Sequence, residues 1–284
     1  MYVITGATGH VGSVAAEALL AAGKQVRIVV RDAAKAERLK ALGAHVFIAD
    51  LADQEALASA VRGAEGVFLL SPPDMGARDF IAERKRLTER QIHTLAAERV
   101  PHVVLLSSVG AHHASGTGPI LSVRNAETQL REAGLAATFV RAGYFVENWA
   151  VVLPAVKSDG ILPSFIAADR RVCSVSTPDI GPVVAQALID GPRGVRVIEL
   201  SGPSDVSPND VAQACSRILG KPVKVVEAPL DAVVPTFTSL WVSENIASLF
   251  REMYQCIAEG RLVPAGGELV RGKTALETTL RALL

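Results

Sequence analysis

The stretch Val3-Ile4-Thr5-Gly6-Ala7-Thr8-Gly9-His10-Val11-Gly12 decides the fold of this 284-residue chain. It predicts a short apolar strand, a glycine turn and the start of an amphipathic helix. The glycine spacing G-x-x-G-x-x-G is a tighter variant of the G-x-G-x-x-G pattern of dinucleotide-binding turns. Without Cβ atoms, such a turn lets backbone N–H groups and a helix N-terminus approach a pyrophosphate. We therefore predict that the turn binds a dinucleotide; the alternative is a glycine-rich turn without a ligand.

Segments typical of strands and helices alternate from this turn to about residue 141. Continuous apolar runs predict buried parallel strands, and apolar residues at helical spacing separate them. After the first strand and helix, strands are expected at 25–30, 45–49, 66–70, 102–106 and 137–141, and helices at 33–42, 54–61, 78–98 and 121–132. This alternation predicts an α/β fold with a doubly wound parallel sheet of the Rossmann type.

The carboxyl ends of parallel strands meet at one edge of the sheet, where such folds bind their ligands. Arg31 ends the second predicted strand, where a dinucleotide fold meets the adenosine ribose. An arginine there can bind a 2′-phosphate, so we expect NADP(H), with NAD(H) as the second choice. The alternative is that Arg31 only solvates the strand end. The candidate cofactor-binding residues are Gly6, Thr8, Gly9, His10, Val11, Gly12, Arg31, Asp50, Leu51, Ser71, Pro72 and Ser107.

Composition excludes several classes of protein. Lysine and arginine (29) balance aspartate and glutamate (29), so no excess charge recruits nucleic acid or an acidic membrane. The three cysteines are far apart and suggest neither a disulfide framework nor a metal site. There is no apolar run of about 18 residues and no room for a signal peptide before the first strand. We expect a cytoplasmic protein without flavin or metal, compatible with a homodimer.

Several motifs together resemble the NmrA-like family of atypical short-chain dehydrogenases/reductases. They are T-G-A-T-G-H-V-G at 5–12, V-V-R-D at 29–32, A-D-L at 49–51, L-L-S-P at 69–72, L-S-G-P at 200–203 and R-G-K-T at 271–274. The segment R-A-G-Y-F-V-E-N-W at 141–149 is similar to the family's R-P-G-x-x-x-E-N, with Ala142 where proline is usual. The resemblance implies either an NAD(P)H-dependent reductase of quinones, azo dyes or triphenylmethane dyes, or a cofactor-sensing regulator.

The proton-transferring Tyr-x-x-x-Lys pair of ordinary short-chain dehydrogenases is absent. The residues four positions after Tyr2, Tyr144 and Tyr254 are Gly6, Asn148 and Ala258. We therefore predict direct hydride transfer to an electron-poor aromatic acceptor, with Tyr144 and Ser108 as candidate catalytic residues. Tyr144 could equally be a half-buried aromatic residue of the rim. Glu127 and Arg124 have no assigned role, and the adjacent His112 and His113 are better read as a solvated loop pair than as metal ligands.

Beyond residue 150 the regular alternation ends. We expect residues 1–150 to form the Rossmann domain, with about 172–200 returning to it, and 151–284 to form an α+β substrate-side subdomain. Strands are expected at 195–200 and 223–226, and helices starting at Thr177, at Ser207 and, with a capping box, at Thr274. Residues 235–241 are expected to be irregular, and the apolar stripe of 246–257 to be core rather than a lid. The candidate pocket residues over the nicotinamide are Phe145, Asn148, Trp149, Phe237 and Trp241.

The sequence thus predicts an NAD(P)H-dependent oxidoreductase that passes hydride to a quinone-like or azo-type aromatic acceptor. Its expected partner is a small aromatic substrate, with neither nucleic acid nor a membrane involved. The alternative is an NAD(P)-sensing regulatory protein that acts through protein partners with little or no catalysis.

Overall fold

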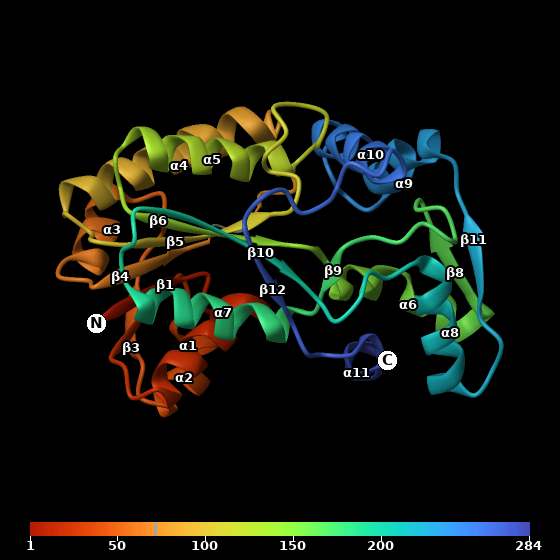
Figure 1. Cartoon of the computed structure of the whole chain (residues 1–284), viewed down its shortest axis with the longest axis horizontal. Helices are drawn as coiled ribbons and strands as arrows, with labels where there is room; N and C mark the ends of the chain where they lie inside the picture. The colour runs from red at the N-terminus through yellow and green to blue at the C-terminus, as the bar shows by residue number, and fades with distance from the viewer. Residues whose placement is uncertain (71–72) are drawn as a thin grey trace.

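The computed structural model describes residues 1–70 and 73–284. Within these residues eight parallel strands form the main sheet (Figure 1). Their spatial order is β12 (Glu268–Arg271), β10 (Val195–Ser201), β6 (Ala137–Ala142), β5 (Val103–Ser108), β4 (Gly66–Leu69), β1 (Tyr2–Thr5), β2 (Val26–Val30) and β3 (His45–Ile48). The chain starts near the middle of the sheet and winds outward in both directions. The predicted doubly wound Rossmann-type fold is confirmed.

Helices cover both faces of this sheet (Figure 1). One face packs against α3 (Gln54–Val61), α4 (Phe80–Ala97) and α5 (Ile120–Glu132). The other packs against α1 (His10–Ala21), α2 (Glu37–Ala41) and α7 (Thr177–Asp190). Successive strand residues enter opposite cores, as Val3 and Ile4 do. In the inner strands β1 and β4 every residue is buried, and these strands are mainly apolar rather than alternating.

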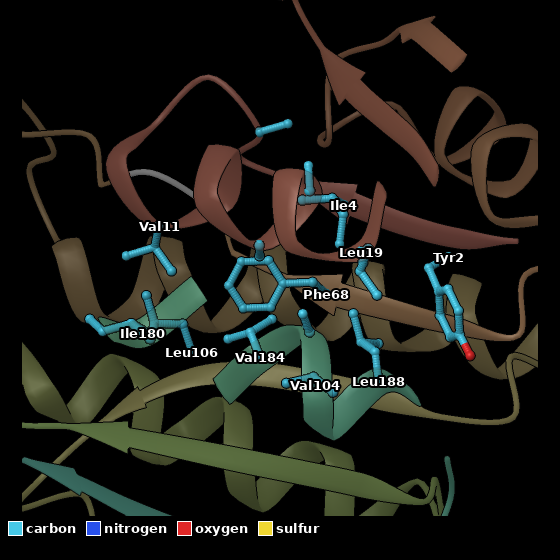
Figure 2. Packing of buried hydrophobic residues seen from close by; sticks show 14 of the residues in the cluster. Tyr2, Ile4, Val11, Leu19, Phe68, Val104, Leu106, Ile180, Val184 and Leu188 are labelled. Atoms are coloured by element: carbon cyan, nitrogen blue, oxygen red, sulfur yellow. The ribbon is translucent and has the colours of Figure 1, made fainter. Parts of the chain in front are cut away.

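The tightest helix packing joins α1 to α7. Figure 2 shows Phe68 of β4 with Leu19 of α1 and Val184 of α7 close to it, and all three side chains are buried in one cluster. A Cβ atom at Gly181 would lie 2.6 Å from the Cβ of Val14, so only glycine lets α7 cross α1 at this distance. The α1 helix that follows the glycine turn is therefore held on two sides, by the sheet and by α7.

The second half builds a smaller layer beside the main sheet (Figure 1). Strands β8 (Ile161–Ser164) and β11 (Lys224–Glu227) pair in parallel, and β7 (Tyr144–Phe145) pairs with β9 (Ser174–Val175). A separate apolar cluster joins these strands to their helices. Those helices are η2 (Val146–Val152), α6 (Leu153–Asp159), α8 (Pro208–Leu219), α10 (Glu244–Ala258) and α11 (Leu276–Leu283). Helix α9 (Val233–Ser239) packs on α10 and follows the short 3₁₀ turn η3 (Leu230–Ala232), and a second such turn, η1 (Ala33–Ala36), precedes α2.

Two predicted features of the second half are confirmed. The strand predicted at 195–200 is β10, which lies between β6 and β12 in the main sheet. The helix predicted to start at Ser207 is α8. It also has a capping box, because the Ser207 hydroxyl accepts from the N–H of Asp210 and the Asp210 carboxylate accepts from the N–H of Ser207. The strand β12 was not expected from the sequence, so residues assigned to the substrate-side subdomain also supply an edge of the main sheet.

Three local predictions are wrong. Residues 233–239 form helix α9 rather than an irregular segment, because Pro235 lies in the first turn, where its missing N–H costs nothing. Thr274 caps no helix: its hydroxyl donates to Asp179 at 2.8 Å, and α11 begins after Ala275. The helix expected at 33–42 starts as η1 and becomes α-helical only at Glu37.

Candidate functional site

The glycine turn between β1 and α1 is closed tightly. Gly6 has φ +63°, in the left-handed region that favours glycine, and its carbonyl accepts from the N–H of Gly9 at 3.0 Å. A Cβ atom at Gly12 would lie 2.3 Å from the same carbonyl oxygen. Helix α1 has Gly9 as its N-cap, which offers no side-chain acceptor to the first-turn N–H groups. These N–H groups and the exposed Thr8 and His10 face the rim, an arrangement suited to an anion.

Thr5 fixes this turn to the neighbouring strand. Its hydroxyl contacts the carbonyls of Phe68 and Leu70, both at 2.9 Å, and lies 2.8 Å from the N–H of Leu70. The side chain is fully buried. Thr5 therefore holds the end of β4 against the glycine turn. Ser71 and Pro72, which follow Leu70, lie outside the described residues, so their predicted contact with the cofactor stays a prediction.

The candidate residues for the adenosine end of the cofactor follow the next two strands, Arg31 for the ribose and Asp50 for the adenine. Arg31 is exposed directly after β2, and within the described residues no hydrogen bond or ion pair of its guanidinium is found. Its neighbour Asp32 instead caps η1, accepting from the N–H of Ala34 at 2.9 Å. Asp50 is exposed after β3 and accepts from the N–H of Ala52 at 2.9 Å, while the Leu51 carbonyl accepts from a side chain of α4. The Arg31 side chain is thus left exposed, whereas the Asp32 carboxylate is used to cap η1.

A buried ion network lies behind the end of β5. The Ser107 hydroxyl donates to Glu127 of α5 at 2.6 Å. Arg141 of β6 binds both oxygens of Glu127, at 2.8 and 2.7 Å, and binds Glu199 of β10 at 3.1 Å. The hydrogen bonds with Glu127 raise the pKa of the Arg141 guanidinium against the effect of burial. Glu127 therefore has a structural role, and the Ser107 hydroxyl points into the protein toward it. The next residue, Ser108, is half-buried and donates to the Val109 carbonyl at 2.9 Å.

The loop between β5 and α5 keeps its two histidines in place without a metal arrangement. Arg124 donates to the carbonyls of Ala111 and His112, at 3.2 and 3.1 Å. The rings of His112 and His113 lie 3.9 Å apart, and His113 Nε2 lies 3.0 Å from the carbonyl of Arg261. Burial lowers the pKa of His112, and the neighbouring His113 adds to this effect. These contacts tie the loop to the C-terminal part of the chain.

Tyr144 stands at the same rim, two residues after β6. Ala142, the last residue of β6, pairs with Ser108 of β5, so Tyr144 follows close to the end of β5. Its ring meets Trp149 edge-on, with centroids 6.5 Å apart. Burial raises the pKa of its phenol well above 10, and the neighbouring Tyr254 of α10 adds to this effect. The phenol therefore keeps its proton at neutral pH.

Two groups of rings make up what we call the aromatic cluster: the pair Tyr144 and Trp149, and the connected rings of Phe165, Phe237, Phe250 and Tyr254. Tyr254 lies 5.4 Å from Phe165 and 6.4 Å from Phe237, and Phe237 lies 4.8 Å from Phe250. The rings come from β7, η2, the end of β8, α9 and α10. Phe165 and Tyr254 were missed from the sequence, because isolated aromatic residues give no periodic signal.

The other predicted pocket residues lie differently. Asn148 is exposed, and its side chain acts to lower the pKa of the Tyr144 phenol against the larger effect of burial. Phe145, the next residue in β7, enters the opposite core, beside the cluster of α1 and α7. Trp241 is 95% exposed with φ +65°, so the expectation that it lines a pocket is wrong in this structure. It lies at the turn after α9, where its side chain is carried outward.

Glu147, in the E-N segment, also has a structural role. Its carboxylate accepts from the N–H and the hydroxyl of Thr177, at 2.8 and 2.7 Å, and so caps α7. Helix α7 packs on α1, so this contact links the segment after β6 to the helix that follows the glycine turn. The helix predicted at Thr177 begins there, with Ser176 at its N-cap position.

Within residues 1–70 and 73–284, no three His, Cys, Asp or Glu side chains are arranged to hold a metal ion. None of the helices in that part of the chain is both long and apolar enough to cross a membrane. The three cysteines are buried free thiols, and burial raises the pKa of Cys173 to about 12.

Comparison with known proteins agrees with this geometry. The sequence profile of the NmrA-like family matches residues 2–277. An NAD(P)H azoreductase of Xenophilus azovorans is 27% identical over 256 residues, covering 89% of this chain and 86% of the relative. A (4-alkanoyl-5-oxo-2,5-dihydrofuran-3-yl)methyl phosphate reductase of Streptomyces griseus is 32% identical over 235 residues, covering 82% and 78%. Quinone oxidoreductase 2 of Escherichia coli is 30% identical over 228 residues, covering 78% and 76%.

One solved structure compares the folds directly. The crystal structure of the NADPH-dependent quinone oxidoreductase QOR2 from Escherichia coli, complexed with NADPH, superposes with a TM-score of 0.80. The two chains are 26% identical in this superposition, which covers 93% of this chain and 91% of the other. The likeness therefore spans both the main sheet and the smaller layer beside it.

Proposed function

Because the chain belongs to the NmrA-like family, we propose that it is an NADPH-dependent oxidoreductase that reduces a quinone-like or azo-type aromatic acceptor. The observation that carries this proposal is the placement of the glycine turn and the aromatic cluster at one rim of the sheet. The relatives with these names, an azoreductase and a quinone oxidoreductase, support the same reaction class. When bound, the reduced nicotinamide supplies the hydride.

The residues present fit a dinucleotide. The missing Cβ at Gly12 and the left-handed Gly6 let the first turn of α1 approach a pyrophosphate closely. Arg31, exposed at the end of β2, is placed to bind a 2′-phosphate with a charge-assisted contact. Asp50 and Leu51 follow β3 and face the adenosine side. These contacts favour NADP(H) over NAD(H).

The acceptor side favours a flat, electron-poor molecule. Half-buried rings of Tyr144, Phe165 and Phe237 offer a wall against which an aromatic acceptor can stack. With no Tyr-x-x-x-Lys pair, the chain is unsuited to alcohol oxidation by the usual route. For an acceptor that takes hydride readily, correct orientation of its ring against the nicotinamide is enough for the reaction.

The test is NADPH oxidation with a panel of quinones and azo dyes, followed by the loss of reduced-nicotinamide absorbance. We expect turnover with at least one quinone, and faster turnover with NADPH than with NADH. Gly12→Ala, which removes the space for the turn, is the matched inactive variant. Absence of turnover above background for every acceptor would overturn the proposal. The regulator alternative is not favoured, since the relatives named above are reductases.

A further inference from the structure

The first turns of two helices that are far apart in the sequence are joined directly. Helix α4 begins at Phe80, whose N–H is one of the first-turn donors that have no partner within their own helix. This N–H donates to the side-chain oxygen of Asn245, in the first turn of α10, at 3.0 Å. In return, the N–H of Ser243, the N-cap of α10, donates to the carbonyl of Met75 at 2.9 Å. We call these two hydrogen bonds the α4–α10 contact.

A small apolar cluster surrounds the α4–α10 contact. Its buried members are Ala77, which precedes α4, Phe80 of α4 and Ile246 of α10. Among the described residues, this cluster is much smaller than the one that buries Met253 and Cys256 in the second half of α10. The N-terminal half of α10 is therefore held less firmly than the rest of the helix, and the two hydrogen bonds matter more there.

The same half of α10 carries part of the aromatic cluster. Phe250 packs against the residues around the α4–α10 contact, and its ring lies 4.8 Å from that of Phe237. The carbonyl of Phe237 accepts from the N–H of Val242, the residue before Ser243, at 3.3 Å. The position of the Phe237 ring therefore depends on the α4–α10 contact through its own backbone and through its neighbour Phe250.

On its other side the α4–α10 contact belongs to the rim that fits the cofactor. Met75 and Ala77 precede α4, and the end of β4 at Leu70 is held against the glycine turn by Thr5. Helices α9 and α10 lie on the same side of the main sheet as α4 and α5 (Figure 1). The contact thus joins the cofactor side of the rim to the aromatic wall of the acceptor side.

We propose that Asn245 is a positioning residue, which holds the aromatic wall of α9 and α10 in the arrangement that an acceptor needs. Without its hydrogen bond, the first turn of α10 separates from α4 in part of the molecules. An acceptor then binds only the remaining molecules, so its apparent affinity falls by that fraction. Once the acceptor is bound, hydride transfer proceeds as before. This inference rests on the proposed function, because it concerns the acceptor side of the same site.

The experiment compares Asn245→Ala with Asn245→Asp. Alanine removes the oxygen that accepts from Phe80, whereas aspartate keeps an accepting oxygen at this position. Gln255→Ala, at an exposed position in the last turn of the same helix, is the control. Steady-state kinetics with NADPH and one quinone give kcat and both KM values. Hydrogen exchange followed by mass spectrometry measures the opening of the first turns of α4 and α10 and does not depend on turnover.

For Asn245→Ala we expect the KM for the quinone to rise about 3- to 10-fold, the range that one hydrogen bond can contribute. Both kcat and the KM for NADPH should change by less than about 2-fold, because the lost interaction affects acceptor binding alone. Exchange should become faster in the first turns of α4 and α10. Asn245→Asp and Gln255→Ala should stay near wild type.

An unchanged quinone KM or unchanged exchange in Asn245→Ala would overturn the inference. So would an equal rise in the KM for NADPH, or the same loss in Asn245→Asp. A wild-type protein without quinone turnover would instead overturn the proposed function, and the exchange rates would still show whether Asn245 keeps the α4–α10 contact closed.

Discussion

Arg141 of β6 and Glu127 of α5 form a bidentate ion pair inside the protein, with Nε–Oε1 and Nη2–Oε2 distances of 2.8 and 2.7 Å. The two residues are 6% and 1% exposed, and Glu199 lies on the other side of the guanidinium. A buried charge is stable only while its partners remain. The network joins β6, β10 and α5 directly behind the rim, so its loss should be felt in both stability and activity.

The first prediction concerns this pair. Glu127→Gln leaves the Arg141 charge without its bidentate partner and should lower the free energy of unfolding by about 3 kcal/mol. The effect is at the low end for a buried pair because Glu199 still faces Arg141. Urea unfolding measures it. Glu132→Gln, an exposed position at the end of the same helix, is the control and should change stability by less than about 0.5 kcal/mol. Equal stability of the two variants would contradict the structural role of Glu127.

The second prediction is that Gly12 and Gly9 of the turn differ in how well they tolerate alanine. Gly12→Ala places a Cβ 2.3 Å from the Gly6 carbonyl oxygen and should cost about 1–3 kcal/mol of stability, together with NADPH binding. At Gly9 the nearest atom to a Cβ is 3.4 Å away and φ is −92°, so Gly9→Ala should cost about 1 kcal/mol or less. Thermal unfolding and fluorescence titration with NADPH measure both effects. A Gly9→Ala variant less stable than Gly12→Ala would show that the turn is built differently.

Cofactor choice gives the third prediction. Arg31→Ala should weaken NADPH binding by about 1–3 kcal/mol, the scale of one charge-assisted contact, and leave NADH binding unchanged. Dissociation constants for the two cofactors, measured by titration, give this comparison. Lys40→Ala removes a positive charge from the nearby helix α2 and serves as the control. Equal losses for both cofactors would mean that Arg31 does not contact the 2′-phosphate.

The fourth prediction is a pH dependence of stability. His102 is fully buried, with Nε2 3.0 Å from the Thr138 hydroxyl, and burial lowers its pKa, with Arg196 adding to the effect. The folded protein therefore favours the neutral ring. Its stability should be complete above about pH 6.5, the value of a free histidine, and should fall below it as the unfolded chain takes up the proton first.

One histidine can change the free energy of unfolding by at most about 1.4 kcal/mol per pH unit. His102→Gln should flatten the fall of Tm between pH 7 and 5, whereas His93→Gln, at an exposed position of α4, should not. Differential scanning calorimetry at several pH values provides the measurement. Parallel pH profiles for wild type and His102→Gln would exclude His102 as the source.

Most of the main sheet could be predicted from the sequence, because its signals are local. Apolar runs such as the one that becomes β4, and the helical spacing that becomes α3, depend only on neighbouring residues. Strand β12 could not be predicted, since its residues are mostly exposed and it exists only through pairing with β10. The prediction that Thr274 caps the last helix was wrong for the same reason, because a long-range contact decides its role. Its hydroxyl bonds to Asp179 of α7 instead of capping its own helix.

The candidate site also has a part that could be predicted from the sequence and a part that could not. The glycine turn and Arg31 follow from a local motif and its position in the fold. The ion network does not, since Glu127 and Glu199 lie far from Arg141 in the sequence and meet it only in the folded sheet. The effect of Tyr254 on the pKa of Tyr144 likewise depends on where α10 packs. The sequence identifies the candidate residues, whereas only the folded structure shows which of them come into contact.

The position of β10 and β12 also bears on how the chain is made. On the ribosome, β6 emerges early but gains its second neighbour only when residues 195–201 have been synthesised. Helix α7, which covers α1, also follows the first 150 residues. Until then an apolar sheet face and an open strand edge are exposed, and such surfaces promote aggregation. We therefore expect folding to be completed late in translation, with the nascent chain a natural client for chaperones that bind apolar segments.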